Sequence, residues 1–86
     1  MTKKKKAFGR YIVSDPLICH GRLTYRGTRV MVDGVLALLA EGRDWDDIIN
    51  QFHGSIPRAA IAETIRLAMR ALGKQADEYR KQAASA

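Results

Sequence analysis

The chain has 86 residues, enough for one domain with one small hydrophobic core. It carries 15 Lys and Arg against 9 Asp and Glu, a formal net charge of +6. The longest unbroken apolar run, Val35 to Ala40, is far shorter than the ~20 residues of a membrane span. Cys19 is the single cysteine, so an internal disulfide is impossible. These facts exclude a membrane protein, a disulfide-stapled secreted module and a large enzyme with a deep pocket, and we expect a cytoplasmic protein.

The charges are unevenly distributed along the chain. Residues 1–30 contain eight basic side chains and one acidic one, residues 31–55 one basic and five acidic, and residues 56–86 six basic and three acidic. A basic–acidic–basic order is typical of a protein whose ends contact a polyanion while its middle faces away. An ordinary soluble surface with a lysine-rich end has the same composition, so both interpretations stay open.

The N-terminal part is predicted to be an arm followed by short strands. The adjacent lysines Lys3 to Lys6 repel one another, so residues 1–10 are expected to form a basic disordered arm. The β-prone run Tyr11–Val13 and residues 23–25 and 28–32 are expected to be extended pieces separated by turns. Each piece is too short to be stable alone, so this part must lean on the helices or on a second chain.

Beyond residue 32 the apolar residues recur with a helical period. The spacing predicts three helices, at residues 34–41, 45–52 and 57–72. Asp44 is expected to cap the second helix, and Pro57 stands where the third begins. The predicted fold is mainly α, a trihelical helix-turn-helix with a short N-terminal β segment over residues 11–72. Residues 73–86 are expected to form a polar tail, helical or frayed.

The third predicted helix leaves one side exposed, and an exposed helix fits the DNA major groove, which is about 12 Å wide. This side carries Arg58, Arg66 and Arg70, whose guanidinium groups can grip phosphates or read guanine edges. We predict that these arginines contact double-stranded DNA. The arm contains four lysines, Lys3, Lys4, Lys5 and Lys6. We expect them to add salt-sensitive affinity for DNA, or else to form only a solvated tail. A two-fold homodimer is expected because it places two such helices one turn of DNA apart, about 34 Å.

A second stripe of the same helix and its tail is weakly apolar. It suggests contact with a partner protein or a second subunit, although a thicker core stripe would look the same. The candidate partner-binding residues are Ala60, Leu67, Ala71 and Tyr79. An interaction module or adaptor without DNA binding is therefore the alternative function. RNA binding is a third possibility, but the chain has few aromatic residues for stacking bases.

The pair Cys19-His20 suggests chemistry, but its surroundings in the sequence do not support it. A metal site needs three or four ligands, and the chain has one Cys and two His. Neighbours on an extended segment face opposite ways, so His20 reaches the Cys19 thiol poorly as a base. We therefore expect no catalytic residues, no metal and no cofactor. Trp45 is expected in the core, and Arg29 is expected to pair with an acid, Asp33 or Glu41.

Several segments, taken in order, carry a resemblance to one known family. They are YIVSDP at 11–16, ICHG at 18–21, RGTRV at 26–30, VLALLAEG at 35–42 and WDDII at 45–49. Over residues 11–72 the chain resembles domain-of-unknown-function family 433. The resemblance implies a homeodomain-like helix-turn-helix preceded by a small β segment. It also implies a VapB-type antitoxin that represses its own promoter and neutralises a PIN-like ribonuclease toxin.

Overall fold

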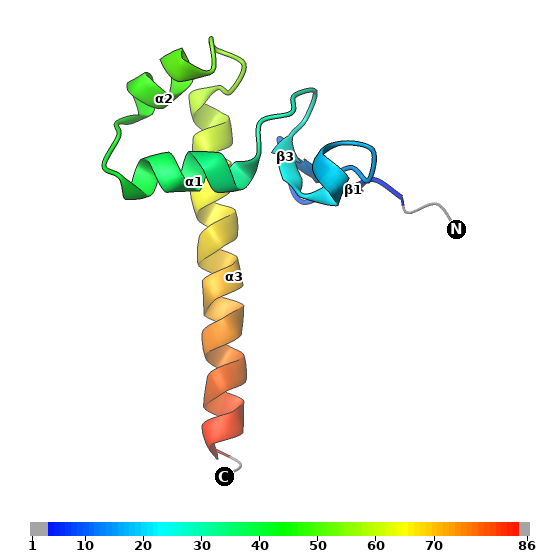
Figure 1. The fold of residues 1–86 in the computed structure, drawn as a ribbon. Coiled ribbons are helices and arrows are strands. Elements are labelled where there is room, and N and C mark those ends of the chain that lie inside the picture. Colours follow the sequence, from blue (N-terminus) through cyan, green and yellow to red (C-terminus); the bar gives the residue numbers. More distant parts are fainter. Residues whose placement is uncertain (1–3, 85–86) are drawn as a thin grey trace.

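Short strands occupy the N-terminal third of the protein and helices occupy the rest. The structure, a computed structural model, describes residues 4–84. Its elements in chain order are β1 (Lys6–Ala7), β2 (Ile12–Ser14), a 3-10 turn η1 (Cys19–Gly21), β3 (Leu23–Tyr25), α1 (Val32–Ala40), α2 (Trp45–Gln51) and α3 (Arg58–Ala84). Figure 1 shows α1 crossing α3, with α2 on one side of the upper part of α3 and the sheet on the other.

The strands form a three-stranded antiparallel sheet in the order β1-β2-β3. Ile12 of β2 pairs with Tyr25 of β3, and Ala7 of β1 pairs with Val13 on the other edge of β2. Ile12, Val13 and Tyr25 are buried, and Ile12 and Tyr25 belong to the hydrophobic interior. Strands this short are stabilised mainly by what they pack against, and here β2 packs against α3.

The prediction of a mainly α, trihelical fold is wrong, because the protein has a mixed α/β architecture with a sheet of its own. Lys6 and Ala7, which lie in the segment expected to be a disordered arm, form β1 along the edge of β2. The backbone makes these ladder bonds, so the repelling lysine side chains that suggested disorder do not prevent them. The expected β segment therefore supplies β2 and β3, and β1 adds a third strand at the free edge of β2, which packs against α3.

The helices follow the predicted periodicity, with shifted boundaries. α1 begins two residues earlier than expected, and α3 continues without a break through Gly73 to Ala84, a length of 27 residues. The predicted cap is confirmed: the Asp44 carboxylate accepts a hydrogen bond from the Asp47 backbone N–H at 3.0 Å. The acids of α2 thus lie at the positive end of its dipole.

The hydrophobic interior lies where α1 and α2 meet the first half of α3 and the sheet. Its fully or nearly fully buried residues are Ile12, Tyr25, Val32, Val35, Ile48, Ile56, Ala60 and Ile61. A buried hydrogen bond of 2.6 Å joins the Tyr25 hydroxyl to Thr64 Oγ1, which itself donates to the Ala60 carbonyl. Burial raises the pKa of Tyr25. The first half of α3 is therefore held on three sides, and its remaining side is open to solvent.

Candidate nucleic-acid interface

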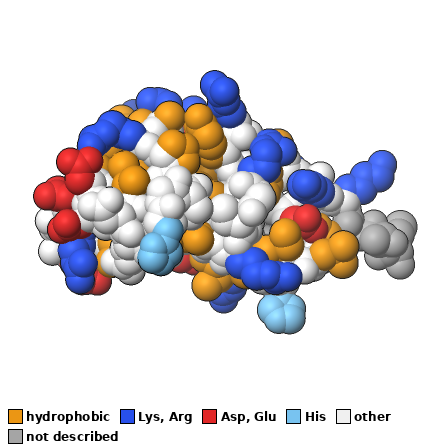
Figure 2. Space-filling view, turned by 90° about the horizontal axis from the view of Figure 1, so that it is seen from above, with side chains coloured by type: hydrophobic (Ala, Val, Ile, Leu, Met, Phe, Trp, Pro, Cys, Tyr) orange, Lys and Arg blue, Asp and Glu red, His pale blue; other side chains and the backbone are white. Residues whose placement is uncertain are grey.

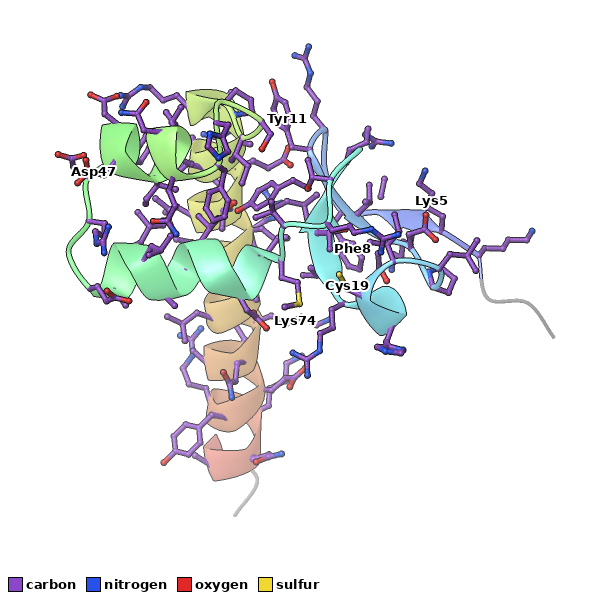
Figure 3. The ribbon with its side chains drawn as sticks, turned by 45° about the horizontal axis from the view of Figure 1, so that its top comes forward. Lys5, Phe8, Tyr11, Cys19, Asp47 and Lys74 are labelled. Atoms are coloured by element: carbon purple, nitrogen blue, oxygen red, sulfur yellow. The ribbon has the colours of Figure 1, made fainter. Side chains whose placement is uncertain are left out.

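Glu63 joins α3 to the turn that leads into β2. Its carboxylate oxygens accept hydrogen bonds from three consecutive backbone N–H groups, those of Arg10 (2.7 Å), Tyr11 (2.8 Å) and Ile12 (3.0 Å). Figure 3 shows Tyr11 beside the upper turns of α3. We call this arrangement the Glu63 clasp. It fixes the turn before β2, and with it Arg10, against α3.

The environment of Glu63 keeps its carboxylate ionised. Burial alone would raise its pKa, but the three N–H donors and the nearby Arg66 guanidinium outweigh burial, and the pKa lies below its usual value. Gly9 is part of the same fit, since a Cβ at this position would lie 2.6 Å from the Glu63 carboxyl group. The turn before β2 therefore lies against the Glu63 carboxylate, which a side chain at Gly9 would displace.

Three exposed arginines, Arg10, Arg26 and Arg66, lie next to the clasp. The Arg26 Nε–H donates to the Arg10 carbonyl at 3.1 Å, and Arg66 lies close enough to Glu63 to lower its pKa. Arg70 follows Arg66 one turn further along α3. We define the basic surface as these four exposed residues, Arg10, Arg26, Arg66 and Arg70. It combines side chains from the segments next to β2 and β3 with side chains from α3.

The acidic side chains gather elsewhere. Figure 2 shows a cluster of them at the end of the molecule formed by α1 and α2, with some Lys and Arg beside it, while Lys and Arg predominate over the rest of this face. The exposed acids of this region are Glu41, Asp44, Asp46 and Asp47, and Figure 3 shows Asp47 on the other side of α3 from the sheet. The acidic middle of the sequence therefore forms one acidic region at the α1–α2 end of the molecule.

The outer face of α3 beside the arginines carries small side chains. Ala59 is exposed and Ala62 is half-buried, and both precede Arg66 on the open side of the helix. Small residues let a ligand approach the helix backbone, while the guanidinium groups reach outward from it. This part of α3 thus has the shape of a surface that can lie against another molecule.

Arg58 does not belong to the basic surface, although it was predicted with Arg66 and Arg70. Its guanidinium forms an ion pair with Asp46 of α2 and lies 5.5 Å from the centre of the Trp45 ring. Trp45 is half-buried and packs at the edge of the interior. Arg58 therefore ties α2 to the start of α3, and its positive charge is largely compensated.

The described members of the predicted lysine run lie on the sheet side, away from the helices. Lys4, Lys5 and Lys6 are exposed, and the Lys6 ammonium lies 4.9 Å from the centre of the Phe8 ring. Lys3 falls outside the described residues. Figure 3 places Lys5 further from α3 than Tyr11. The structure therefore does not bring these lysines together with Arg66 and Arg70. Three residues of the site, Arg10, Arg26 and Glu63, carry no signal in the sequence that pointed to them.

The predicted partner-binding residues are also separated. Ala60 is fully buried and is not available to a partner. Leu67 and Ala71 line an apolar groove of about 280 Å³ between α3, α1 and β3. The other residues of this groove are Leu23, Val32, Asp33, Leu36, Thr64 and Ala68. Tyr79 is exposed, two turns beyond Ala71.

The Cys19-His20 pair lies in the η1 turn, where both residues have positive φ angles. The Cys19 Sγ lies 3.6 Å from the Arg29 carbonyl oxygen, and His20 is exposed. Within residues 4–84 no three His, Cys, Asp or Glu side chains gather into a group that could hold a metal ion.

Asp33, one of the two acids expected to pair with Arg29, forms its ion pair with Arg22 instead, at 3.6 Å.

Residues 12–68, from the first residue of β2 to the middle of α3, match a protein family described as "Protein of unknown function (DUF433)". The chain belongs to the DUF433 family. Arg26, Glu63 and Arg66 lie within the part of the chain that matches DUF433, whereas Arg10 and Arg70 lie outside it. No curated protein and no solved structure matches the chain. Among the described residues, no helix combines the length and apolarity that crossing a membrane requires.

Proposed function

We propose that this DUF433 protein binds double-stranded DNA through the basic surface and represses transcription of its own gene. The observation that carries the proposal is the grouping of Arg10, Arg26 and Arg66 at the Glu63 clasp, with Arg70 one turn further along α3. The Glu63 charge is held by backbone donors, and four of the other eight acids, Glu41, Asp44, Asp46 and Asp47, lie at the α1–α2 end. A strong positive potential therefore develops on one side of the molecule.

Duplex DNA offers a complementary ligand for this surface. It carries one negative charge per about 1.7 Å of helix axis, and guanidinium forks bind phosphate oxygens in pairs. The side of α3 with Ala59 and Ala62 carries only small side chains, so it can enter the major groove of DNA, which accommodates a single α-helix. Arg66 and Arg70 then extend from α3 itself, while Arg10 and Arg26 reach phosphates from the sheet.

Replacing Arg66 and Arg70 together by Ala is expected to weaken binding to a labelled duplex from the region upstream of the gene by about tenfold or more. If each arginine releases one phosphate counterion, the slope of log affinity against log salt should fall by about 1.8. Fluorescence anisotropy over a salt series measures both quantities, and circular dichroism checks that the fold is retained.

The matched control is Arg22→Ala/Arg43→Ala, which removes the same charge from exposed sites outside the basic surface. We expect this variant to keep most of the affinity and the slope. An equal loss in the two double variants would mean that total charge, and not this surface, binds DNA. Lack of binding by the unmodified protein at low salt would contradict the proposal directly.

A protein-binding role is the second candidate function, in which the protein is an antitoxin that holds a PIN-like toxin. The apolar groove beside Leu67 and Ala71 favours it, since an apolar segment of a partner would be shielded from water there. Ala71→Glu is then expected to abolish co-purification with the product of the adjacent gene. Ala59→Glu, the same change at an exposed site outside the groove, should not. Equal capture by both variants would contradict a toxin in this groove.

A further inference from the structure

We propose that the protein forms a two-fold dimer in which the C-terminal halves of α3 from two copies pack against each other in antiparallel orientation. The proposal concerns a surface of α3 separate from the basic surface and from the apolar groove. It names the contact and the orientation, and it does not depend on DNA binding. Three features of the structure carry it: the projection of α3, the pattern of its apolar side chains and the distribution of its charges.

The C-terminal half of α3 projects away from the rest of the protein. Figure 1 shows no other element beside this half, and all side chains from Met69 to Ala83 are exposed. A helix of about this length gains little stability from its own hydrogen bonds in water, because isolated helices under 12–15 residues are marginal. Packing against another surface would stabilise it.

Apolar residues form a continuous stripe along this projecting half. They recur at alternating intervals of four and three residues, which is the heptad spacing of a coiled-coil seam. The residues of the stripe, which we call the α3 stripe, are Ile65, Met69, Leu72, Ala76, Tyr79 and Ala83. Met69, Leu72 and Tyr79 have exposed fractions of 66%, 68% and 70%, although each is a large apolar or aromatic side chain. Three such residues on one exposed face are costly to leave in water.

The sizes of the side chains in the stripe fit a second copy of the same stripe in antiparallel orientation. In that orientation Leu72 of one copy opposes Ala76 of the other, and every layer pairs a larger side chain with a smaller or more flexible one. The other layers pair Tyr79 with Met69 and Ile65 with Ala83. A parallel pair would oppose Leu72 with Leu72 and Ala76 with Ala76. Layers with two large side chains would then alternate with layers of two small ones, and the voids in the small layers would lose dispersion contacts.

The charges along α3 favour the same orientation. In this antiparallel register Asp77 of one copy lies level with Ala71 of the other, next to Arg70, whereas a parallel pair would place Asp77 level with Asp77. The positions that flank the centre of the stripe, Gly73 and Gln75, carry no charge. Arg66 does come level with the region of Arg80 in the second copy, but Arg80 already pairs with Asp77 of its own helix.

The shape of the protein also agrees with an antiparallel pair. The sheet, α1 and α2 all lie at the N-terminal end of α3, and Ile65 packs against their common interior. A parallel pair would bring two copies of α2 to the same end, on the side where the stripe begins. An antiparallel pair places the two N-terminal parts at opposite ends of the paired helices.

Sedimentation equilibrium over a concentration series tests the dimer. The unmodified chain is expected to reach twice its monomer mass of 9.6 kDa, and Leu72→Ser/Tyr79→Ser is expected to remain a monomer. The matched control is Lys74→Ser/Glu78→Ser, which makes two changes within the same turns, keeps the net charge and lies outside the stripe. A monomeric unmodified protein, or an Leu72→Ser/Tyr79→Ser variant that still dimerises, would overturn the proposal.

Cysteine cross-linking tests the orientation. Chains with Cys19→Ser and either Leu72→Cys or Ala76→Cys are mixed under oxidising conditions, with a tag on one of them. The antiparallel pair predicts that the main product joins Leu72→Cys to Ala76→Cys, since these positions share a layer. Equally efficient joining of two Ala76→Cys chains would show a parallel pair instead. Failure to bind DNA changes neither measurement, so the dimer and the proposed function can fail separately.

Discussion

Replacing Glu63 by Ala is expected to lower the free energy of unfolding by about 2–4 kcal/mol. The substitution removes the acceptor of three backbone N–H groups at once, and hydrogen bonds to a charged group contribute about 1.5–3 kcal/mol each when they are buried. The Tyr11 and Ile12 donors are only partly accessible to water, whereas the Arg10 donor is exposed and can be hydrated, which keeps the total below the sum of three bonds. Urea denaturation followed by circular dichroism measures the loss.

The same residue should make stability depend on pH. The pKa of Glu63 in the folded protein lies below its value in the unfolded chain, about 4.3. Its contribution is therefore fully present above that value and is lost as the pH falls through the folded pKa. Glu63→Gln is expected to be less stable than the unmodified protein at pH 7 and to approach it in stability under acid conditions. A constant difference across this range would mean that the charge of Glu63 does not stabilise the fold.

Gly9 offers an independent way to loosen the clasp. Gly9→Ala places a methyl group where the Glu63 carboxylate now lies, so the carboxylate must move and weaken its bonds. Gly34→Ala in α1 is the matched control, because nothing lies within 4 Å of its added Cβ. We expect a loss of stability in Gly9→Ala and a small gain in Gly34→Ala.

Loosening the clasp should also weaken DNA binding. In both Glu63→Ala and Gly9→Ala, Arg10 and Arg26 lose their fixed place beside α3, so DNA affinity should fall although Arg66 is unchanged.

Local sequence patterns predict the helices well and the sheet poorly, for a physical reason. Helical periodicity and the cap at Asp44 act within a few residues, so a short window of sequence contains the whole signal. Strand β1 depends on its backbone pairing with β2, and the lysines that surround it suggest the opposite structure. The end of α3 is a similar case, since Gly73 lowers helix propensity without ending the helix.

The candidate site was predictable only where it lies on one helix. The spacing of Arg66 and Arg70 is sufficient to place both on the open face of α3. In the sequence Arg58 is also an arginine on the predicted third helix, like Arg66 and Arg70. Its ion pair with Asp46 joins two helices, however, and depends on how they pack. The contact between Glu63 and Arg10 joins residues 53 positions apart, and no local pattern indicates it. Contacts between elements therefore decide which predicted residues form a common surface.

Replacing Ile61 by Ala is expected to lower the free energy of unfolding by about 2–5 kcal/mol, because it removes three carbons from a filled interior and leaves a cavity. Ile61 is 0% exposed and lies in the interior between α3 and its neighbours. Ile61→Val should cost only about 0.5–1.5 kcal/mol. Leu17→Ala is the control, since Leu17 is 85% exposed and its truncation should change stability by less than about 0.5 kcal/mol.

Ile61 and Glu63 are two residues apart on α3, yet their substitutions should affect different parts of the protein. A typical stability of about 0.05–0.15 kcal/mol per residue leaves a chain of this length little reserve, so Ile61→Ala should bring it close to global unfolding. Glu63→Ala should instead free the sheet first. Hydrogen exchange can separate the two effects: Glu63→Ala should lose protection mainly in β2 and keep it in α1, whereas Ile61→Ala should lose protection in both. Equal loss in α1 for the two variants would mean that the sheet and the helices unfold as one unit and that the clasp is part of the core.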